Sequence, residues 1–130
     1  MDKRPDTLLT GGCYCGKIRY DLDGEPKRVA NCHCRNCRRI SGGTTVAWIL
    51  ARKADFHYTQ GQPQTFLSDT GATWSFCPKC GTTLTYEGKD YTQQIDIALV
   101  TLDGHEKYPP LRDANASERL PWIRVVSTEE

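Results

Sequence analysis

Apolar and polar residues follow one another along this chain in short runs that turn residues separate. The runs are rich in Val, Ile, Thr, Tyr and Phe, which favour extended backbone, and glycines stand between them. Within residues 94–99 the apolar Ile95, Ile97 and Leu99 alternate with Gln94, Asp96 and Ala98, as in a strand with one buried face. We therefore predict strands over residues 17–22, 44–50, 56–58, 65–67, 82–86 and within 91–102.

Helical periodicity is weak, because no stretch of ten or more residues carries an apolar stripe with helical spacing. The best helical candidate is Arg35–Ile40, which the Ser41-Gly42-Gly43 sequence would end. The sequence thus predicts a mainly β fold with little helix. We expect one domain over residues 8–130, preceded by a loose, charged tail at residues 1–7.

The three tryptophans are predicted to be core residues, because large aromatic side chains are usually well buried. They are Trp48, Trp74 and Trp122. Trp48 follows the cysteines at 32–37 closely enough to line a pocket beside them. Trp122 belongs to Leu120–Ile123, which we expect to be an apolar anchor that returns the C-terminal part of the chain to the body.

The charges are nearly balanced, since 17 Lys and Arg residues stand against 16 Asp and Glu residues and the formal charge is +1. Such a chain has no overall electrostatic attraction to nucleic acid or to an acidic membrane. The longest wholly apolar stretch is Val46–Ala51, and the first residues lack the apolar region of a secretory signal. We therefore expect a soluble, cytoplasmic protein without a membrane or nucleic-acid partner.

Seven cysteines stand in three groups whose spacing is typical of zinc ligands. The groups are Cys13-Tyr14-Cys15, Cys32-His33-Cys34-Arg35-Asn36-Cys37 and Cys77-Pro78-Lys79-Cys80. Two thiols separated by one or two residues can converge on one tetrahedral ion, because the backbone between them turns tightly. A disulfide framework is the alternative, but the cysteine count is odd, no export signal is apparent, and thiols this close are poorly placed to bridge. Zinc is therefore the better interpretation.

The first and third groups are predicted to form one closed structural zinc site, called here the four-cysteine site. Its ligands are Cys13, Cys15, Cys77 and Cys80. Four thiolates complete a tetrahedron and leave no position for a substrate. For Cys77 and Cys80 a redox pair is the alternative, but the alternation of strand and helix that such a motif requires is absent. Gly81 instead suits a knuckle whose backbone amides turn toward the sulfurs.

The middle group, called here the three-cysteine site, supplies the thiolates of Cys32, Cys34 and Cys37. Three protein ligands are the number at which a zinc ion keeps an open position. Such an ion can act as a Lewis acid, so these residues are candidates for catalysis as well as metal ligands. His33 lies between two ligands on extended backbone, so we expect its side chain to point away from the ion and pack.

Basic residues surround the three-cysteine site. They are Lys27, Arg28, Arg35, Arg38 and Arg39. Such a local positive field can lower thiol pKa values and attract a ligand that carries carboxylates. The alternative is that these side chains only neutralise the cysteine group and face water.

Three ordered motifs carry a resemblance. They are Gly-Gly-Cys-x-Cys-Gly at 11–16, Cys-His-Cys-x-x-Cys-Arg at 32–38 followed by Ser41-Gly42, and Phe-Cys-x-x-Cys-Gly-Thr-x-Leu at 76–84. Together they resemble the glutathione-dependent formaldehyde-activating enzyme family, which also includes centromere protein V. The similarity continues more weakly to about Trp122. The chain departs from the family pattern at Asn115-Ala116, where members often carry a His-Ile pair.

The resemblance implies a β-tent fold of twisted antiparallel sheets, with a structural zinc at the four-cysteine site and a second zinc at the three-cysteine site. It also implies a carbon–sulfur lyase that joins glutathione to formaldehyde and forms S-hydroxymethylglutathione. In such an enzyme Arg35, Arg38 and Arg39 would hold glutathione carboxylates through bidentate contacts, and Trp48 would line the binding site.

Two other functions remain open from the sequence. A non-catalytic zinc-binding module would use both metal sites as structure and recruit a protein or nucleic-acid partner through the arginines. A nucleic-acid module, however, should carry an extended basic surface with interleaved aromatics, whereas the basic cluster here is confined to residues 27–39. A redox or zinc sensor would release its ion when the three-cysteine site is oxidised.

Overall fold

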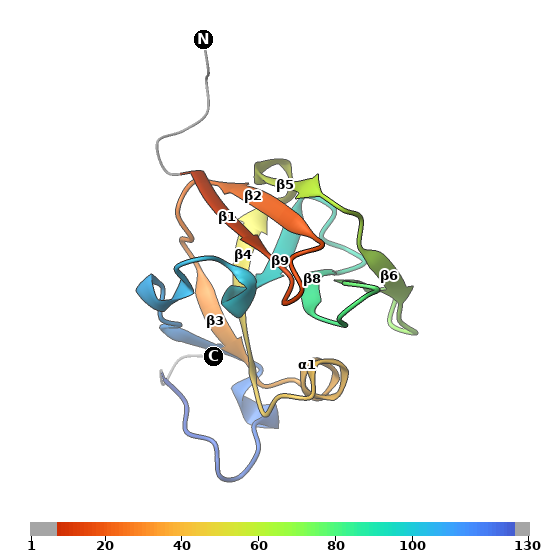
Figure 1. The fold of residues 1–130 in the computed structure, drawn as a ribbon. Coiled ribbons are helices and arrows are strands. Elements are labelled where there is room, and N and C mark those ends of the chain that lie inside the picture. Colours follow the sequence, from red (N-terminus) through yellow and green to blue (C-terminus); the bar gives the residue numbers. More distant parts are fainter. Residues whose placement is uncertain (1–7, 127–130) are drawn as a thin grey trace.

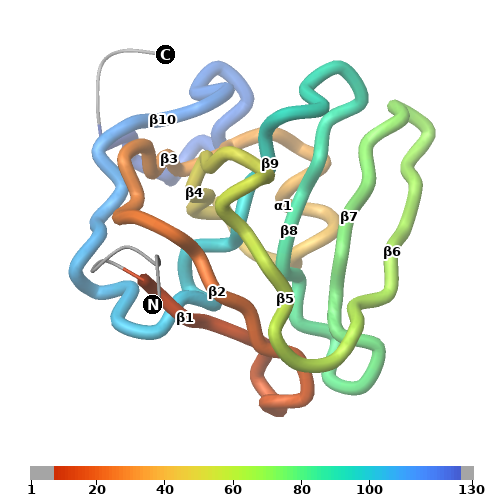
Figure 2. The backbone as a smooth tube through the Cα atoms, turned by 90° about the horizontal axis from the view of Figure 1, so that it is seen from above, coloured from red at the N-terminus to blue at the C-terminus, as the bar shows by residue number. Residues whose placement is uncertain are grey.

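The computed structural model describes residues 8–126, which form two β-sheets (Figure 1). The smaller sheet has three antiparallel strands in the order β1-β2-β5. They are β1 (Leu8–Gly12), β2 (Arg19–Asp23) and β5 (Phe56–Gln60). Figure 2 shows that this sheet crosses over one face of the larger sheet.

The larger sheet has seven strands in the order β10-β3-β4-β9-β8-β7-β6, which can be followed from left to right in Figure 2. Neighbouring strands are antiparallel except for β10 and β3, which run parallel. The strands are β3 (Val29–Cys32), β4 (Val46–Arg52), β6 (Gln64–Leu67), β7 (Thr73–Phe76), β8 (Thr83–Glu87), β9 (Gln94–Ala98) and β10 (Arg112–Ala114).

The two faces of the larger sheet have different surroundings, because successive residues of a strand point to opposite faces. Ile49 and Ile97 point toward the smaller sheet and pack with Tyr20 and Leu22 in the main core. The opposite face carries a second buried cluster, formed by Cys32, Cys37, Trp48, Trp74 and Ala98. The alternation along each central strand therefore separates the hydrophobic core from the cysteine-bearing face.

The α-helix α1 (Arg35–Ser41) begins after Cys34, whose sulfur accepts a hydrogen bond from the backbone N–H of Cys37. It ends at Gly42, which has a φ of 79° and donates its N–H to the carbonyl of Arg38. The predicted helix is thus confirmed. Four 3-10 turns complete the described elements: η1 (Lys53–Asp55), η2 (Leu99–Thr101), η3 (His105–Lys107) and η4 (Ala116–Glu118).

The mainly β fold of twisted antiparallel sheets is confirmed, and a strand lies in each predicted strand segment. The strand predicted within 91–102 ends at Ala98, because Leu99 begins η2. The strands β1, β3, β7 and β10 were not predicted. Two glycines end β1 and β10 has three residues, so neither carries the composition or the alternation that indicates a strand.

Trp48 and Trp74 are buried as predicted, whereas the prediction for Trp122 is wrong, since 69% of this residue is exposed. The backbone N–H of Ile123 donates to the carbonyl of Leu120 at 3.0 Å. The supposed apolar anchor is therefore a turn, and the indole at its tip points outward instead of packing.

Two expectations concern the extent of the domain. The predicted tail at residues 1–7 lies outside the described residues, and the single domain over residues 8–130 stays a prediction. Between residues 8 and 126 the longest apolar helical segment falls short of the length that a membrane span needs.

Candidate metal centres and substrate pocket

The four-cysteine site joins the turn after β1 to the loop between β7 and β8. Its four sulfurs lie within 4.8 Å of one another. The Sγ atom of Cys15 lies 3.6 Å from that of Cys13 and 3.8 Å from that of Cys77. Sulfurs bound at about 2.3 Å to a tetrahedral zinc ion lie about 3.8 Å apart. The spacing therefore fits a single metal ion enclosed by four thiolates.

Hydrogen-bond donors point at these sulfurs. The backbone N–H of Ile18 donates to the Sγ atom of Cys13 at 3.3 Å, and the N–H of Cys80 donates to that of Cys77 at 3.4 Å. The hydroxyl of Thr82 lies 3.1 Å from the Sγ atom of Cys80 and lowers the pKa of this thiol to about 5, with help from the Thr82 amide. Such donors stabilise the thiolate, which is the form that binds metal.

The three-cysteine site lies where β3 runs into α1. Cys32 ends β3, Cys34 caps the helix and Cys37 lies in its first turn. The Sγ atoms of Cys32 and Cys37 are 3.2 Å apart, and all three sulfurs lie within 4.8 Å of one another. A helix that starts directly after the second cysteine brings the third back to the same side. The group could hold a metal ion and leave a fourth coordination position open.

Hydrogen bonds favour a negative charge on Cys32. The S–H of Cys37 donates to Cys32, which lowers the pKa of Cys32 to about 6 and raises the pKa of Cys37. The side-chain amide of Asn115 also donates to the Sγ atom of Cys32, at 3.5 Å. Asn115 thus lies beside the three-cysteine site. It stands where this chain departs from the His-Ile pair described above, and its contact with Cys32 was not predicted from the sequence.

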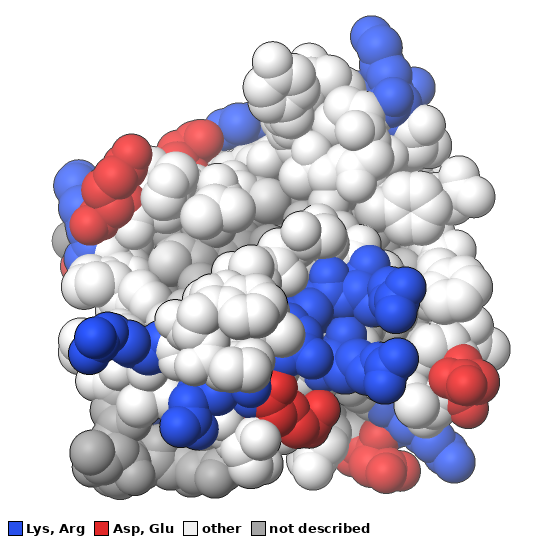
Figure 3. Space-filling model, turned by 90° about the horizontal axis from the view of Figure 1, so that it is seen from below, with Lys and Arg blue, Asp and Glu red and all other residues white. Residues whose placement is uncertain are grey.

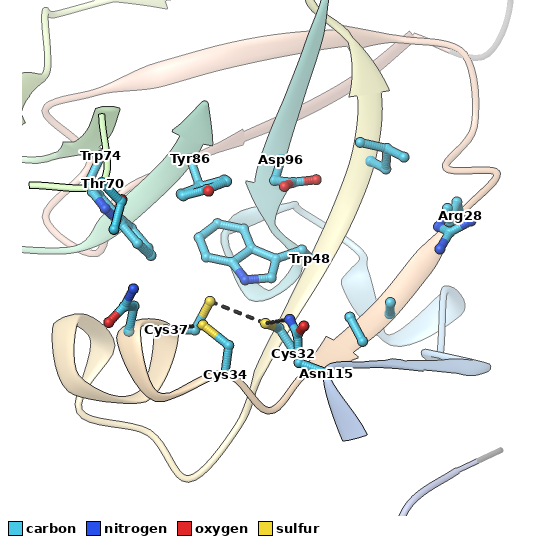
Figure 4. A pocket seen from close by; sticks show the side chains of 14 residues that line it. Arg28, Cys32, Cys34, Cys37, Trp48, Thr70, Trp74, Tyr86, Asp96 and Asn115 are labelled. Atoms are coloured by element: carbon cyan, nitrogen blue, oxygen red, sulfur yellow. Dashed lines mark hydrogen bonds between the residues drawn. The ribbon is translucent and has the colours of Figure 1, made fainter. Parts of the chain in front are cut away.

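A pocket of about 280 Å³ opens beside the three-cysteine site, and all three cysteines line it (Figure 4). Its wall on the sheet is aromatic and consists of Trp48, Trp74 and Tyr86. The ring centroids of the two tryptophans are 6.1 Å apart, and those of Trp74 and Tyr86 are 4.7 Å apart. Only Trp48 was predicted to line a pocket. The others lie there because Tyr86 is paired with Trp74 in the sheet.

Asp96 lies at the far end of this pocket, beyond Trp48 as seen from the sulfurs (Figure 4). In the sheet it is paired with Leu50 on β4 and with Tyr86 on β8. Burial raises the pKa of the Asp96 carboxyl to about 6, the charge of Cys32 acts in the same direction, and Arg28 opposes them.

The sequence analysis did not identify Asp96 as a site residue, although the signal was present. In the alternating segment the isoleucines on either side of Asp96 point into the main core. Asp96 must therefore point to the opposite face. What the sequence could not supply was the strand order that brings this face beside the cysteines.

His33 is fully buried, and its Nε2 atom lies 2.8 Å from the Oδ1 atom of Asp113 on β10. The other carboxylate oxygen of Asp113 accepts the backbone N–H of Val126 at 2.8 Å. The backbone N–H of His33 donates to the carbonyl of Ala114. The predicted packing role of His33 is confirmed. The contact between His33 and Asp113 joins the Cys32–Cys34 segment to β10 and to the C-terminal segment.

The arginines predicted to bind substrate lie on α1 and are not part of the pocket lining. Arg35 and Arg39 are exposed, whereas Arg38 donates to the carbonyl of Glu118 at 2.7 Å. Figure 3 shows a group of Lys and Arg side chains on the lower face of the molecule, the face on which α1 lies in Figure 1. Trp48 therefore lines the pocket, and substrate binding by the three arginines stays a prediction.

The family described as "Glutathione-dependent formaldehyde-activating enzyme" matches residues 8–117, a range that contains all seven cysteines and Asn115. The chain belongs to the glutathione-dependent formaldehyde-activating enzyme family. Both candidate metal sites and the whole lining of the pocket thus lie within the region that defines membership of this family.

Two known proteins are similar to this chain over most of its length. A Halomonas elongata protein named "Putative glutathione-dependent formaldehyde-activating enzyme" is 26% identical, and the alignment covers 95% of this chain and 84% of the relative. The crystal structure of a Rhodobacter sphaeroides protein matches with a TM-score of 0.67 and 18% identity, covering 81% of this chain and 99% of that chain. The first supports the family, and the second shows that the fold recurs in a solved structure.

Proposed function

We propose that this member of the glutathione-dependent formaldehyde-activating enzyme family is a zinc-dependent carbon–sulfur lyase that acts on thiol–aldehyde adducts. The reaction is the formation, and the reverse cleavage, of S-hydroxymethylglutathione from glutathione and formaldehyde. The observation that supports this most is the contrast between the two cysteine groups. One has four sulfurs and is complete, whereas the other has three and opens into a pocket that a small thiol can enter.

The donor sets suit zinc, because thiolates are soft ligands and favour zinc over calcium or magnesium. At the four-cysteine site the ion would be structural. At the three-cysteine site a bound zinc ion would supply a position for the substrate sulfur and lower the pKa of its thiol. Cys32 is suited to hold the cation, since the side-chain amide of Asn115 donates to its sulfur.

The atoms of the proposed reaction balance without any other reactant. In the synthetic direction the S–H bond of glutathione breaks, an S–C bond to formaldehyde forms, and the proton ends on the former carbonyl oxygen. The aromatic wall of Trp48, Trp74 and Tyr86 excludes water from one side of the reacting sulfur and orients the ligand along the pocket.

Further proposals concern ligand recognition and location. Arg35 and Arg39, which are exposed on α1, supply charges for glutathione carboxylates together with Arg38, whose side chain also donates to the carbonyl of Glu118. We also propose a cytoplasmic location, because the seven cysteines are free and thiols persist where the compartment is reducing.

The test is NMR exchange spectroscopy on an equilibrium mixture of glutathione, formaldehyde and their adduct. With the zinc-loaded wild-type protein we expect the exchange rate to rise in proportion to protein concentration. Cys34→Ala should leave the uncatalysed rate, because the open site loses a ligand. Asp90→Asn, which removes an exposed carboxylate outside the pocket, is the control and should behave as wild type.

One result would reject the glutathione and formaldehyde assignment. It is an exchange rate that stays at the uncatalysed value when the wild-type protein is loaded with zinc at both sites.

A further inference from the structure

The Asp96 carboxylate makes no hydrogen bond or ion pair within residues 8–126, although the residue is half-buried. Such a group costs free energy unless something compensates its charge. Arg28 opposes the effect of burial only in part, because its own side chain is exposed and solvated. The pKa of about 6 still leaves Asp96 mostly ionised at neutral pH, so the pocket carries an unpaired negative charge.

Aromatic rings line the pocket beside this charge. The ring centroid of Trp48 lies 6.3 Å from that of Tyr86 and 6.1 Å from that of Trp74. Figure 4 shows the Asp96 carboxylate next to the rings of Trp48 and Tyr86, on the side away from the sulfurs. Aromatic faces attract cations, and a carboxylate beside them strengthens the attraction.

The opposite end of the pocket is negative as well. Three thiolates and one divalent ion sum to a charge of about −1. With zinc bound, a ligand that spans the pocket from the sulfurs to Asp96 would therefore meet negative charge at both ends, although Arg28 also lines the pocket. This favours a cationic group beside Asp96. The volume of about 280 Å³ is near the lower limit for small-molecule sites and favours a ligand of about the size of a tripeptide.

We propose that Asp96, Trp48 and Tyr86 form a subsite for a primary ammonium group, so that the pocket selects small thiols with a free amino group. The proposal rests on the proposed function, because it takes the three-cysteine site as the place of the substrate sulfur. Glutathione meets the requirement through the ammonium group of its γ-glutamyl residue. Large thiols without an ammonium group, such as coenzyme A, do not.

The test compares the binding of S-methylglutathione with that of its deaminated analogue, in which hydrogen replaces the γ-glutamyl ammonium group. The methyl group blocks the thiol, so binding is measured without reaction. Quenching of Trp48 and Trp74 fluorescence reports binding to the zinc-loaded protein. All proteins carry Trp122→Phe, which removes the exposed indole from the signal.

With Asp96 intact, the ammonium-bearing ligand should bind at least about tenfold more tightly than the deaminated one, as expected for a charge-assisted hydrogen bond. In Asp96→Asn the ratio should fall to about one, because the amide carries no charge. Asp90→Asn, the matched loss of an exposed carboxylate, should keep the ratio of the parent protein.

Equal affinities for the two ligands in the parent protein would overturn the proposal, and so would a ratio that survives in Asp96→Asn. A ratio of about one in the parent protein overturns the proposal even if Asp96→Asn does not fold. If the protein catalyses the exchange but binds the two ligands equally tightly, the subsite is rejected and the proposed reaction stands. A high ratio lost in Asp96→Asn, in a protein that does not catalyse the exchange, would support the subsite and reject the proposed reaction.

Discussion

Among single residues, Asp96 is the one for which we expect the clearest effects on both stability and binding. Burial raises its pKa from the ordinary 3.8 to about 6, with Arg28 opposing. The folded protein therefore binds the proton of this carboxyl more tightly than the unfolded chain does. It follows that the ionised carboxylate destabilises the fold above about pH 6, and that this effect disappears below about pH 4.

Asp96→Asn should therefore increase the free energy of unfolding at about pH 8, by roughly 1–3 kcal/mol. The gain should shrink as the pH falls between the two pKa values, because Asp96 of the wild type then takes up its proton. Urea unfolding of the zinc-loaded wild type and Asp96→Asn at several pH values measures the difference between their free energies of unfolding. Effects of acid on the metal sites are common to both proteins and cancel in this difference. A gain that is independent of pH would show that the carboxylate charge is not its cause.

At the scale of elements, the arrangement of the three-cysteine site depends on a short parallel strand. The strand β10 has three residues and, within residues 8–126, pairs only with β3. A buried contact between His33 and Asp113 joins it to the segment that carries Cys32 and Cys34. Because β10 is too short to be stable through backbone pairing alone, we expect this contact to hold it in place.

His33→Ala should lower the free energy of unfolding by about 3–5 kcal/mol, because it leaves the Asp113 carboxylate buried without its imidazole partner. The double variant His33→Ala/Asp113→Ala should lose less than the sum of the two single variants. Urea unfolding of the four proteins gives the coupling energy. Strict additivity would contradict a direct interaction between the two side chains.

The elements that the sequence predicted are those with a local signal. The segment at β9 alternates, and α1 ends at a glycine in the left-handed conformation. In contrast, β10 is a strand only because residues about eighty positions earlier supply its partner. The Trp122 prediction failed for a related reason, since hydrophobicity alone does not distinguish a buried residue from one at the tip of a turn.

For the whole molecule, the four-cysteine site joins segments that are far apart in sequence. The sulfurs of Cys15 and Cys77 are 62 positions apart along the chain and 3.8 Å apart in space. Structural zinc sites contribute about 10–16 kcal/mol in small domains, which is comparable with the entire stability of about 5–15 kcal/mol of a typical domain. The fold of this chain should therefore depend on this ion.

Cys80→Ala should prevent stable folding, because three thiolates would remain around an incomplete structural site. The variant should be unfolded at 25 °C and show no cooperative thermal transition. Circular dichroism during thermal unfolding, on protein purified with zinc, measures this directly. A soluble Cys80→Ala protein that unfolds cooperatively would show that the closed site is not needed for folding.

The cysteine spacing was sufficient to predict which sulfurs come together. The members of each group lie close together in the sequence, and one site with four ligands and one with three account for all seven cysteines. The spacing could not predict the far wall of the pocket. Tyr86 and Asp96 reach the cysteines only through the order of strands in the larger sheet, which depends on contacts throughout the chain.

Zinc content per folded chain tests the central claim most directly. Mass spectrometric metal analysis of freshly purified, reduced protein should give about two zinc ions for the wild type and about one for Cys34→Ala, with both proteins folded by circular dichroism. Wild-type protein that is folded but free of metal, or whose cysteines are joined in disulfides, would contradict the account.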